Sequence, residues 1–264
     1  MTDLSTYRTF LTHVAAVGEV GPGLVQVTFQ GGDLEGFEPV GPDTFLYLLL
    51  PPPGRRDLTI DRSFTWTAYQ EMPEELRPVG AYYTLRHWRP EAAELDIWMV
   101  LHDDPGPASG WATRAAPGDP VALWGPRTAY DPPPDTDWFL LVADETGLPA
   151  AAVICETLPP DVPIRVVAEV ADAAHHQPLP ERPGLDVRWM HRDGRPAGRT
   201  TALLDAVAAA DWPEGNPYVW GGAESRAVSA VRRFVRGTRD LPRERVSLVG
   251  YWRHADHPPE PDED

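Results

Sequence analysis

The sequence predicts two domains, an antiparallel β-barrel followed by an α/β domain with a parallel sheet. Its 264 residues are enough for two ordinary domains. The first half reads as short strands separated by glycine- and proline-rich turns, whereas the second half alternates apolar strands with helical patterns. A proline-rich link at 131–135 lies between them. We therefore expect domains over 1–133 and 134–254, followed by an acidic flexible tail over 255–264.

The first half contains five β-prone runs that are bounded by turn residues. These runs are 24–29, 45–50, 82–86, 95–102 and 121–125. A single helix candidate, 109–116, follows the Gly106-Pro107-Ala108 turn. Several short strands with one helix among them are typical of a small antiparallel barrel.

The second half has a different periodicity. Residues 138–143 are apolar throughout, which is typical of a strand buried on both faces. Further strands are expected at 164–170, 185–190, 218–221 and 246–251, and helices at 148–158, 201–210 and 225–236. Strands that alternate with helices at this spacing predict a parallel, doubly wound sheet.

Charge and composition exclude several classes of protein. The chain has 40 acidic and 23 basic residues, a net charge of −17, so it is not expected to bind nucleic acid or an anionic membrane. All the basic residues are arginines, which excludes a P-loop or Schiff-base lysine. The lone Cys155 excludes an internal disulfide framework. With neither a signal-peptide pattern nor a membrane-spanning apolar run, we expect a cytoplasmic protein.

A series of short motifs occurs in a fixed order along both halves. They lie at 83–86, 95–102, 106–112, 117–119, 125–127, 144–150 and 250–253. Together they resemble the siderophore-interacting proteins, which are FAD-dependent ferric-siderophore reductases of the ferredoxin-reductase-like superfamily. The resemblance extends over roughly residues 8 to 254. It implies a flavin-binding barrel followed by a nicotinamide-binding α/β domain.

The resemblance implies a set of FAD-binding residues. They are Tyr83, Thr84, Leu85, Arg86, Val100, Leu101, His102, Gly106, Pro107, Ala108, Ser109, Thr146, Tyr251 and Trp252. The Tyr83 ring can pack on the isoalloxazine, and the Thr84 hydroxyl or backbone N–H can bond to flavin N5. Small residues before a helix can receive the pyrophosphate. The alternatives are an ordinary Tyr-Thr pair in a strand and a plain helix cap at Ser109.

One position departs from the family pattern. The family commonly has an arginine two residues before this tyrosine, to neutralise the flavin phosphate, and here that residue is Ala81. We expect Arg86 and a helix terminus to share this role, with Arg62 as a second candidate.

The family also implies a nicotinamide site made by Asp144, Glu145, Thr146, Gly222, Ala223 and Glu224. The first three residues follow an apolar strand, and ligands in such sheets bind beyond the carboxyl ends of strands. Capping of the next helix is an alternative role for Thr146. No G-x-G-x-x-G fingerprint is present, which argues against an ordinary Rossmann domain. A 2′-phosphate would need an arginine such as Arg192, Arg195 or Arg226, so the choice between NADH and NADPH stays open.

A small set of arginines is expected to attract the substrate. Family members use a basic group for anionic ferric siderophores, and here the candidates are Arg127, Arg253 and Arg55. Ordinary surface salt bridges are the alternative. No metal site of the protein itself is expected, because the iron arrives in its chelator, and the His175-His176 pair reads as a solvated loop.

The expected function is reduction of ferric siderophores by FAD, with NADH or NADPH as the electron donor. Since the cofactor carries the chemistry, no catalytic side chain is required. Two alternatives remain: a flavin reductase that takes electrons from reduced ferredoxin, and a siderophore carrier without redox chemistry. The siderophore, the donor and the oligomeric state are not determined by the sequence.

Overall fold

The computed structural model describes residues 7–101 and 106–256. The chain divides into two compact units, Met1–Thr128 and Ala129–Asp264, and each is described by itself. His102 and most of the expected acidic tail lie outside the described residues. Among the helices of the described ranges, none is both long and apolar enough to cross a bilayer.

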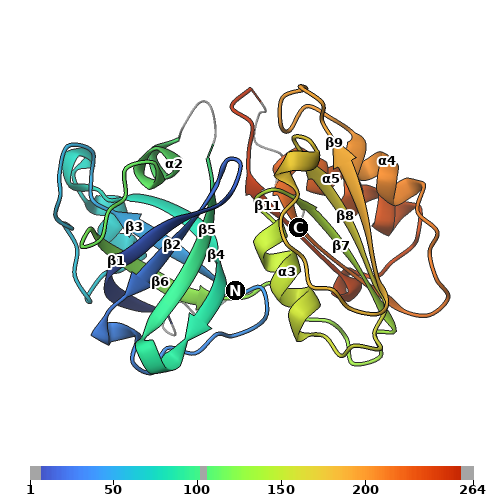
Figure 1. Cartoon of the computed structure of the whole chain (residues 1–264), viewed down its shortest axis with the longest axis horizontal. Helices are drawn as coiled ribbons and strands as arrows, with labels where there is room; N and C mark the ends of the chain where they lie inside the picture. Colours follow the sequence, from blue (N-terminus) through green and yellow to red (C-terminus); the bar gives the residue numbers. More distant parts are fainter. Residues whose placement is uncertain (1–6, 102–105, 257–264) are drawn as a thin grey trace. The chain divides into compact units, whose positions relative to one another are not determined.

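The first unit is a closed antiparallel barrel of six strands (Figure 1). Its strands are β1 (Arg8–Gly21), β2 (Leu24–Gln30), β3 (Phe45–Leu50), β4 (Val79–Arg89), β5 (Glu94–Val100) and β6 (Pro120–Arg127). They are arranged in the order β1-β2-β5-β4-β3-β6, and β6 pairs with β1 to close the barrel. The predicted antiparallel barrel is therefore confirmed.

Side chains alternate between the interior of the barrel and its outer surface. On β3, Leu46, Leu48 and Leu50 belong to the interior core, whereas Tyr47 and Leu49 belong to an aromatic-rich cluster on the opposite face. This is the period of two that a strand imposes on its side chains. The register of β3 therefore determines which face each residue of β4 and β6 occupies.

Two elements of the barrel unit were missed in the sequence, and several others have different limits from those predicted. Strand β1 contains two register shifts, which break the alternation by which strands are recognised. Helix α1 (Trp66–Glu71) is only six residues long and is capped by Thr65. Helix α2 spans Pro107–Ala112, with Gly106 rather than Ser109 at the N-cap, because proline is favoured at the first helical position. Strand β5 ends at Val100 instead of continuing to 102.

The second unit is a parallel sheet covered by helices on both faces (Figure 1). Its strands are β7 (Trp138–Asp144), β8 (Ile164–Val170), β9 (Leu185–His191), β10 (Pro217–Glu224) and β11 (Val246–Trp252), in the order β11-β10-β7-β8-β9. Its α-helices are α3 (Leu148–Thr157), α4 (Ala202–Ala208) and α5 (Ser225–Gly237). Short 3₁₀ turns complete the two units: η2 (Gly32–Leu34), η3 (Glu74–Leu76), η4 (Pro90–Ala92), η5 (Ala173–His175) and η6 (Arg243–Arg245). The predicted parallel α/β architecture is confirmed.

The two faces of this sheet have separate cores. Helix α3 packs with Phe139 and Leu141 on one face, whereas α4 and α5 pack with Leu140 and Val142 on the other. Every residue of β7 and β10 is buried, which explains why these strands read as continuous apolar runs. Cys155 of α3 lies in the first core, and burial raises the pKa of its thiol to about 12.

Candidate functional site

The wall of the barrel is split between β4 and β5. Strand β4 pairs with β3 along Val79–Leu85 through backbone bonds that include Leu85 N–H to Thr44 O at 2.8 Å. It pairs with β5 only along Leu85–Arg89. Beyond that point β5 pairs with β2 alone, and the N–H of Leu101 donates to the carbonyl of Gly23 at 2.8 Å. Within the described residues, the edges of β4 and β5 therefore lack a strand partner where they face one another, which leaves backbone groups for a ligand.

Predicted flavin residues of the first unit meet at this split, whereas Thr146, Tyr251 and Trp252 belong to the second unit. Helix α2 lies against both β4 and β5 (Figure 1). Ala108 of α2 belongs to the interior core, and Tyr83 and Leu101 pack against the same core. The structure thus brings together three motifs that are spread over 25 positions of the sequence, from Tyr83 to Ala108. His102, predicted to join them, falls outside the described residues.

Thr84 has an unusual environment. It is 5% exposed, and its Oγ1 atom is buried without a hydrogen-bond partner among the described residues. The adjacent Tyr83 is largely covered, and burial raises the pKa of its phenol to about 12, so the phenol is neutral at physiological pH. Because buried hydroxyls are normally satisfied, the Thr84 hydroxyl fits a ligand that supplies the missing partner.

The groups predicted to hold the flavin phosphates have different surroundings. Arg86 is buried at a β-bulge, with its guanidinium carbon 4.6 Å from the centre of the Trp98 ring. Ser109 is also buried, and its hydroxyl donates to the Gly106 carbonyl at 3.1 Å. Ala81 pairs opposite Leu48, on the interior face. Arg62, the second candidate, forms a two-bond pair with Asp33 at 2.6 and 2.7 Å.

The three predicted substrate arginines differ in how they are held. Arg55 and Arg253 are exposed. Arg127 is half-buried on the outer face of the barrel, and its guanidinium carbon lies 4.3 Å from the ring centre of Tyr7 and 4.7 Å from that of Trp124. Rings rather than carboxylates therefore surround the Arg127 cation.

The predicted nicotinamide residues lie at the carboxyl edge of the parallel sheet. Asp144 ends β7 and Glu224 ends β10, and these strands are neighbours. The chain continues from β7 to β8 on one side, while β10 lies on the other side of β7. This is the topological switch point, where α/β sheets bind their ligands.

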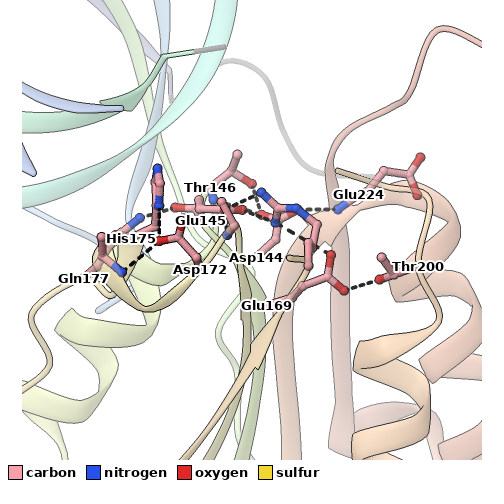
Figure 2. A network of polar contacts seen from close by, with 12 residues as sticks. Asp144, Glu145, Thr146, Glu169, Asp172, His175, Gln177, Thr200 and Glu224 are labelled. Atoms are coloured by element: carbon pink, nitrogen blue, oxygen red, sulfur yellow. Dashed lines mark hydrogen bonds and ion pairs between the residues drawn. The ribbon is translucent and has the colours of Figure 1, made fainter. Parts of the chain in front are cut away.

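Asp144 joins three strand ends at this edge. Its Oδ1 atom accepts bonds from the N–H and the hydroxyl of Thr146, at 2.9 and 2.6 Å. Its Oδ2 atom accepts a bond from the Glu224 N–H at 2.9 Å (Figure 2). The same oxygen accepts a bond from the Trp252 indole at 2.7 Å. Burial and the charge of Glu145 raise the pKa of Asp144 to about 6, although the bonds from Thr146 and Trp252 oppose that rise. At neutral pH Asp144 is thus an ionised, fully bonded carboxylate.

A buried ion pair continues the network towards β8 and β9. Arg192, which is 8% exposed, donates to both oxygens of Glu145 at 2.6 and 2.9 Å. Its guanidinium also lies 3.7 Å from Glu169, which accepts a short bond from the Thr200 hydroxyl (Figure 2). Burial acts to lower the pKa of Arg192, but Glu145 and Glu169 raise it overall. Because its charge is already neutralised, Arg192 is poorly suited to receive a 2′-phosphate.

The glycines of this edge are packed closely. A Cβ atom on Gly147 would lie 1.9 Å from the carbonyl oxygen of Gly222. A Cβ atom on Gly222 would lie 2.7 Å from the Tyr251 ring. Glycine is therefore required at position 222, because the Tyr251 ring lies directly against the backbone there. Ala223 is buried, and the Glu224 carboxylate caps α5 by accepting bonds from Arg226 N–H and Ala227 N–H.

Sequence reasoning missed part of this network. Glu169 and Thr200 were not singled out, and Gln177, whose side chain donates to the Glu145 carbonyl at 2.8 Å, was also missed (Figure 2). The one available signal was the acidic Glu169 within the otherwise apolar end of its strand. A charge in such a run requires a buried partner.

The paired histidines lie on a short turn. His175 Nδ1 is 2.8 Å from an Asp172 oxygen, and the His176 ring stacks on Trp189 with 4.0 Å between centres. Among the described residues, no group of three or more histidine, cysteine or carboxylate side chains is placed to hold a metal ion.

Comparison with known proteins covers both units. The model of the siderophore-interacting FAD-binding domain matches residues 13–130, and that of the siderophore-interacting protein family matches residues 136–255. An uncharacterized protein of Mycobacterium bovis is 32% identical over 92% of this chain and 89% of the relative. The ferric vibriobactin reductase ViuB of Vibrio cholerae is 28% identical over 89% of this chain and 86% of the relative. A siderophore utilization protein from T. fusca has a crystal structure that superposes with a TM-score of 0.83, at 31% identity over 95% of each chain. With both of its units matched in this way, the chain belongs to the siderophore-interacting protein family.

Proposed function

We propose that this protein is an FAD-dependent reductase that converts the chelated iron(III) of a siderophore to iron(II), with NADH or NADPH as the electron donor. The observation that carries the proposal is the β4–β5 split, where unpaired strand edges and the unsatisfied Thr84 hydroxyl lie beside Tyr83. Membership in the family and the similarity to ViuB support it.

The residues at the split fit a flavin. The Tyr83 ring offers an aromatic surface, and Thr84 offers a buried hydroxyl that needs a partner. The small residues Ala108 and Ser109 allow close approach to the first turn of α2, and Arg86 supplies a positive charge on the neighbouring strand. When bound, FAD would accept a hydride and release electrons one at a time. The chain's own residues would hold the isoalloxazine and exclude water from it.

We further propose that the nicotinamide donor binds at the carboxyl edge of β7 and β10. The location is the switch point of the sheet, and Asp144, Thr146 and Glu224 are held rigidly there by their mutual bonds. In this interpretation Asp144 is a positioning residue. It orders the Thr146 loop and the Trp252 end of β11, and does not itself exchange a proton with the donor.

The substrate would be an anionic ferric siderophore attracted by Arg127, Arg253 and Arg55. On a chain with a net charge of −17, an anion can approach only where arginines locally outweigh the acidic residues, and we assign that role to these three. Reduction would release the metal, because hard oxygen chelators hold iron(II) less tightly than iron(III).

The test is anaerobic reduction of the FAD-loaded protein, followed by mixing with ferric chelates. We expect a yellow protein that is bleached by NADH or NADPH and is reoxidised by ferric siderophores, with iron(II) trapped by a coloured chelator. Bleaching only by reduced ferredoxin would replace the nicotinamide donor with a protein donor. A protein that does not take up FAD would instead be a siderophore carrier, and the reductase proposal would be wrong.

A further inference from the structure

Helix α5 and the segment after it carry a positive charge, which is the reverse of the chain as a whole. Residues 225–245 contain seven of the 23 arginines and only two of the 40 acidic residues. Helix α5 itself has four arginines and no acidic residue. Because the chain has a net charge of −17, most of its surface repels anions, and this segment is a place that attracts them.

A hollow of about 500 Å³ lies beside the last turns of α5. Arg232, Arg233 and Arg236 line it, and Asp240 is the one acidic residue of its lining. Helix α5 follows β10 and leads back to β11, which runs parallel to β10. The last turns of α5 therefore lie at the edge of the sheet opposite Asp144, and the hollow is separate from the proposed donor site.

The three arginines are placed where their charges repel one another. Arg232 and Arg236 are four positions apart on the helix, and Arg233 and Arg236 are three apart, so both pairs are neighbours on its surface. Like charges at these spacings destabilise a helix, and α5 has no acidic side chain to offset them. A cation in the last turn suits the helix dipole, which accounts for Arg236 only. The cluster therefore indicates a role in binding.

The guanidinium groups of the hollow are not neutralised in the way that a nearby arginine is. Arg245 is paired with Asp135, as expected of an arginine that supports the fold. Arg232 is half-buried and donates to the Leu248 carbonyl of β11, a bond that fixes its side chain beside the hollow. Arg236 is exposed. Within the described part of the chain, neither Arg232 nor Arg236 forms an ion pair with a carboxylate.

A ligand that suits this hollow must be compact and carry several negative charges. Three arginines against one aspartate leave more positive charge than a single carboxylate can neutralise. Guanidinium groups bind phosphate oxygens through paired bonds, and the volume is within the range of small-molecule sites. Successive phosphates can each meet one of the arginines that repeat along the helix. We propose that the hollow binds the oligophosphate group of a small molecule. This site is independent of the proposed reductase function.

The test is calorimetric titration of the purified full chain with sodium tripolyphosphate. We expect one site per chain, with an affinity that falls about tenfold when the ionic strength is raised from about 0.02 to about 0.2 M, because salt screens the attraction. Citrate, which is the competing carboxylate chemistry, should bind about tenfold more weakly than tripolyphosphate, since each of its groups carries less charge.

Variants test each part of the hollow. Arg233→Gln and Arg236→Gln should each weaken tripolyphosphate binding about tenfold. Asp240→Asn should strengthen it about threefold, because the one repulsive charge is removed. Asp240 has a left-handed backbone (φ 56°), which asparagine also adopts, and tighter binding cannot result from misfolding. Arg226→Gln is the matched control, since Arg226 is an exposed arginine in the first turn of the same helix, and it should leave the affinity unchanged.

Four results would overturn the inference. They are the absence of saturable tripolyphosphate binding to the wild type, equal affinity for citrate, weaker binding in Asp240→Asn, and a loss in Arg226→Gln as large as that in Arg236→Gln, which would place the anion at the other end of α5. Binding to phosphatidylserine vesicles without binding of tripolyphosphate would identify a membrane-docking surface instead. Since the titration needs neither FAD nor iron, its failure would not count against the proposed reductase function.

Discussion

The β4–β5 split of the barrel and the carboxyl edge of the parallel sheet both carry predicted ligand residues, yet their hydrogen bonding is opposite. At the split, the Thr84 hydroxyl is buried without a partner in the described structure. At the sheet edge, the two oxygens of Asp144 together accept four bonds. Buried polar groups almost always have hydrogen-bond partners. The Thr84 hydroxyl therefore indicates a position where a ligand supplies the missing bond, whereas Asp144 indicates a network whose bonds are already complete within the protein.

Two arginines show the same contrast. Arg192 is buried between Glu145 and Glu169, and its charge is used within the protein. Arg127 is surrounded by aromatic rings instead of carboxylates, and one of these rings, Tyr82, is also hydrogen-bonded to it. Residue type alone does not distinguish an arginine that supports the fold from one that can meet a substrate, but the chemistry of its neighbours does.

Removing Arg192 should have the largest effect on stability. Arg192→Gln would leave the buried Glu169 and the partly buried Glu145 without their counter-charge. We expect a loss of about 3–5 kcal/mol in the free energy of unfolding, measured by urea denaturation. Arg127→Gln should cost less, about 1–2 kcal/mol, because ring contacts and a bond to Tyr82 are lost but no carboxylate loses its counter-charge. Similar losses for both variants would show that Arg192 does not support the fold more than Arg127 does.

Gly147→Ala tests whether the sheet edge is as tightly packed as its bonding suggests. The added methyl group would overlap the Gly222 carbonyl, so the loop or β10 must move. We expect a loss of about 3 kcal/mol, seen as a lower denaturation midpoint. Gly237→Ala is the matched control, because that site is open and lies in α5. It should be neutral or stabilise the protein by up to about 1 kcal/mol.

The pH dependence of stability tests how the burial of Asp144 affects its titration. Its pKa is raised from 3.8 to about 6, so its ionised form costs about 3 kcal/mol of folding free energy. The contribution of this group to stability is therefore greatest below about pH 4 and is lost as the pH rises through about 6. The Asp144→Asn variant lacks this titration. Its stability deficit relative to the wild type should be larger at pH 4 than at pH 7, and a deficit that grows with pH would contradict the assignment.

Thr84→Val should have the smallest effect on the fold. The substitution removes a hydroxyl that has no partner and keeps the shape of the side chain, so we expect stability without FAD to change by less than about 1 kcal/mol. The dissociation constant for FAD should rise about tenfold, because the bound flavin loses one bond. Thr9→Val, which removes another buried hydroxyl without a partner, is the matched control and should leave FAD affinity unchanged. Unchanged FAD affinity in Thr84→Val would show that the split is not the flavin site.

The sequence anticipated much of the architecture because strong local patterns encode it. The apolar run of β7 and the alternation of strands with helices were enough to predict the parallel sheet. Strand β1 was missed because its register shifts interrupt the pattern, and α1 because a six-residue polar helix carries little signal. The Tyr83, Leu101 and Ala108 motifs could be identified individually, but no local pattern indicates that strands β4 and β5 separate between them.

The two-domain class, the absence of lysine chemistry and the residues that carry the family motifs could be predicted without a structure, since these depend on residue type and short-range period. Which polar groups have hydrogen-bond partners depends instead on how the chain folds. Folding joins Arg192 to Glu145 across 47 positions of the chain and surrounds Arg127 with rings from three separate segments. Hydrogen bonds and ring contacts between distant segments depend on strand register and burial, and these are properties of the folded chain as a whole.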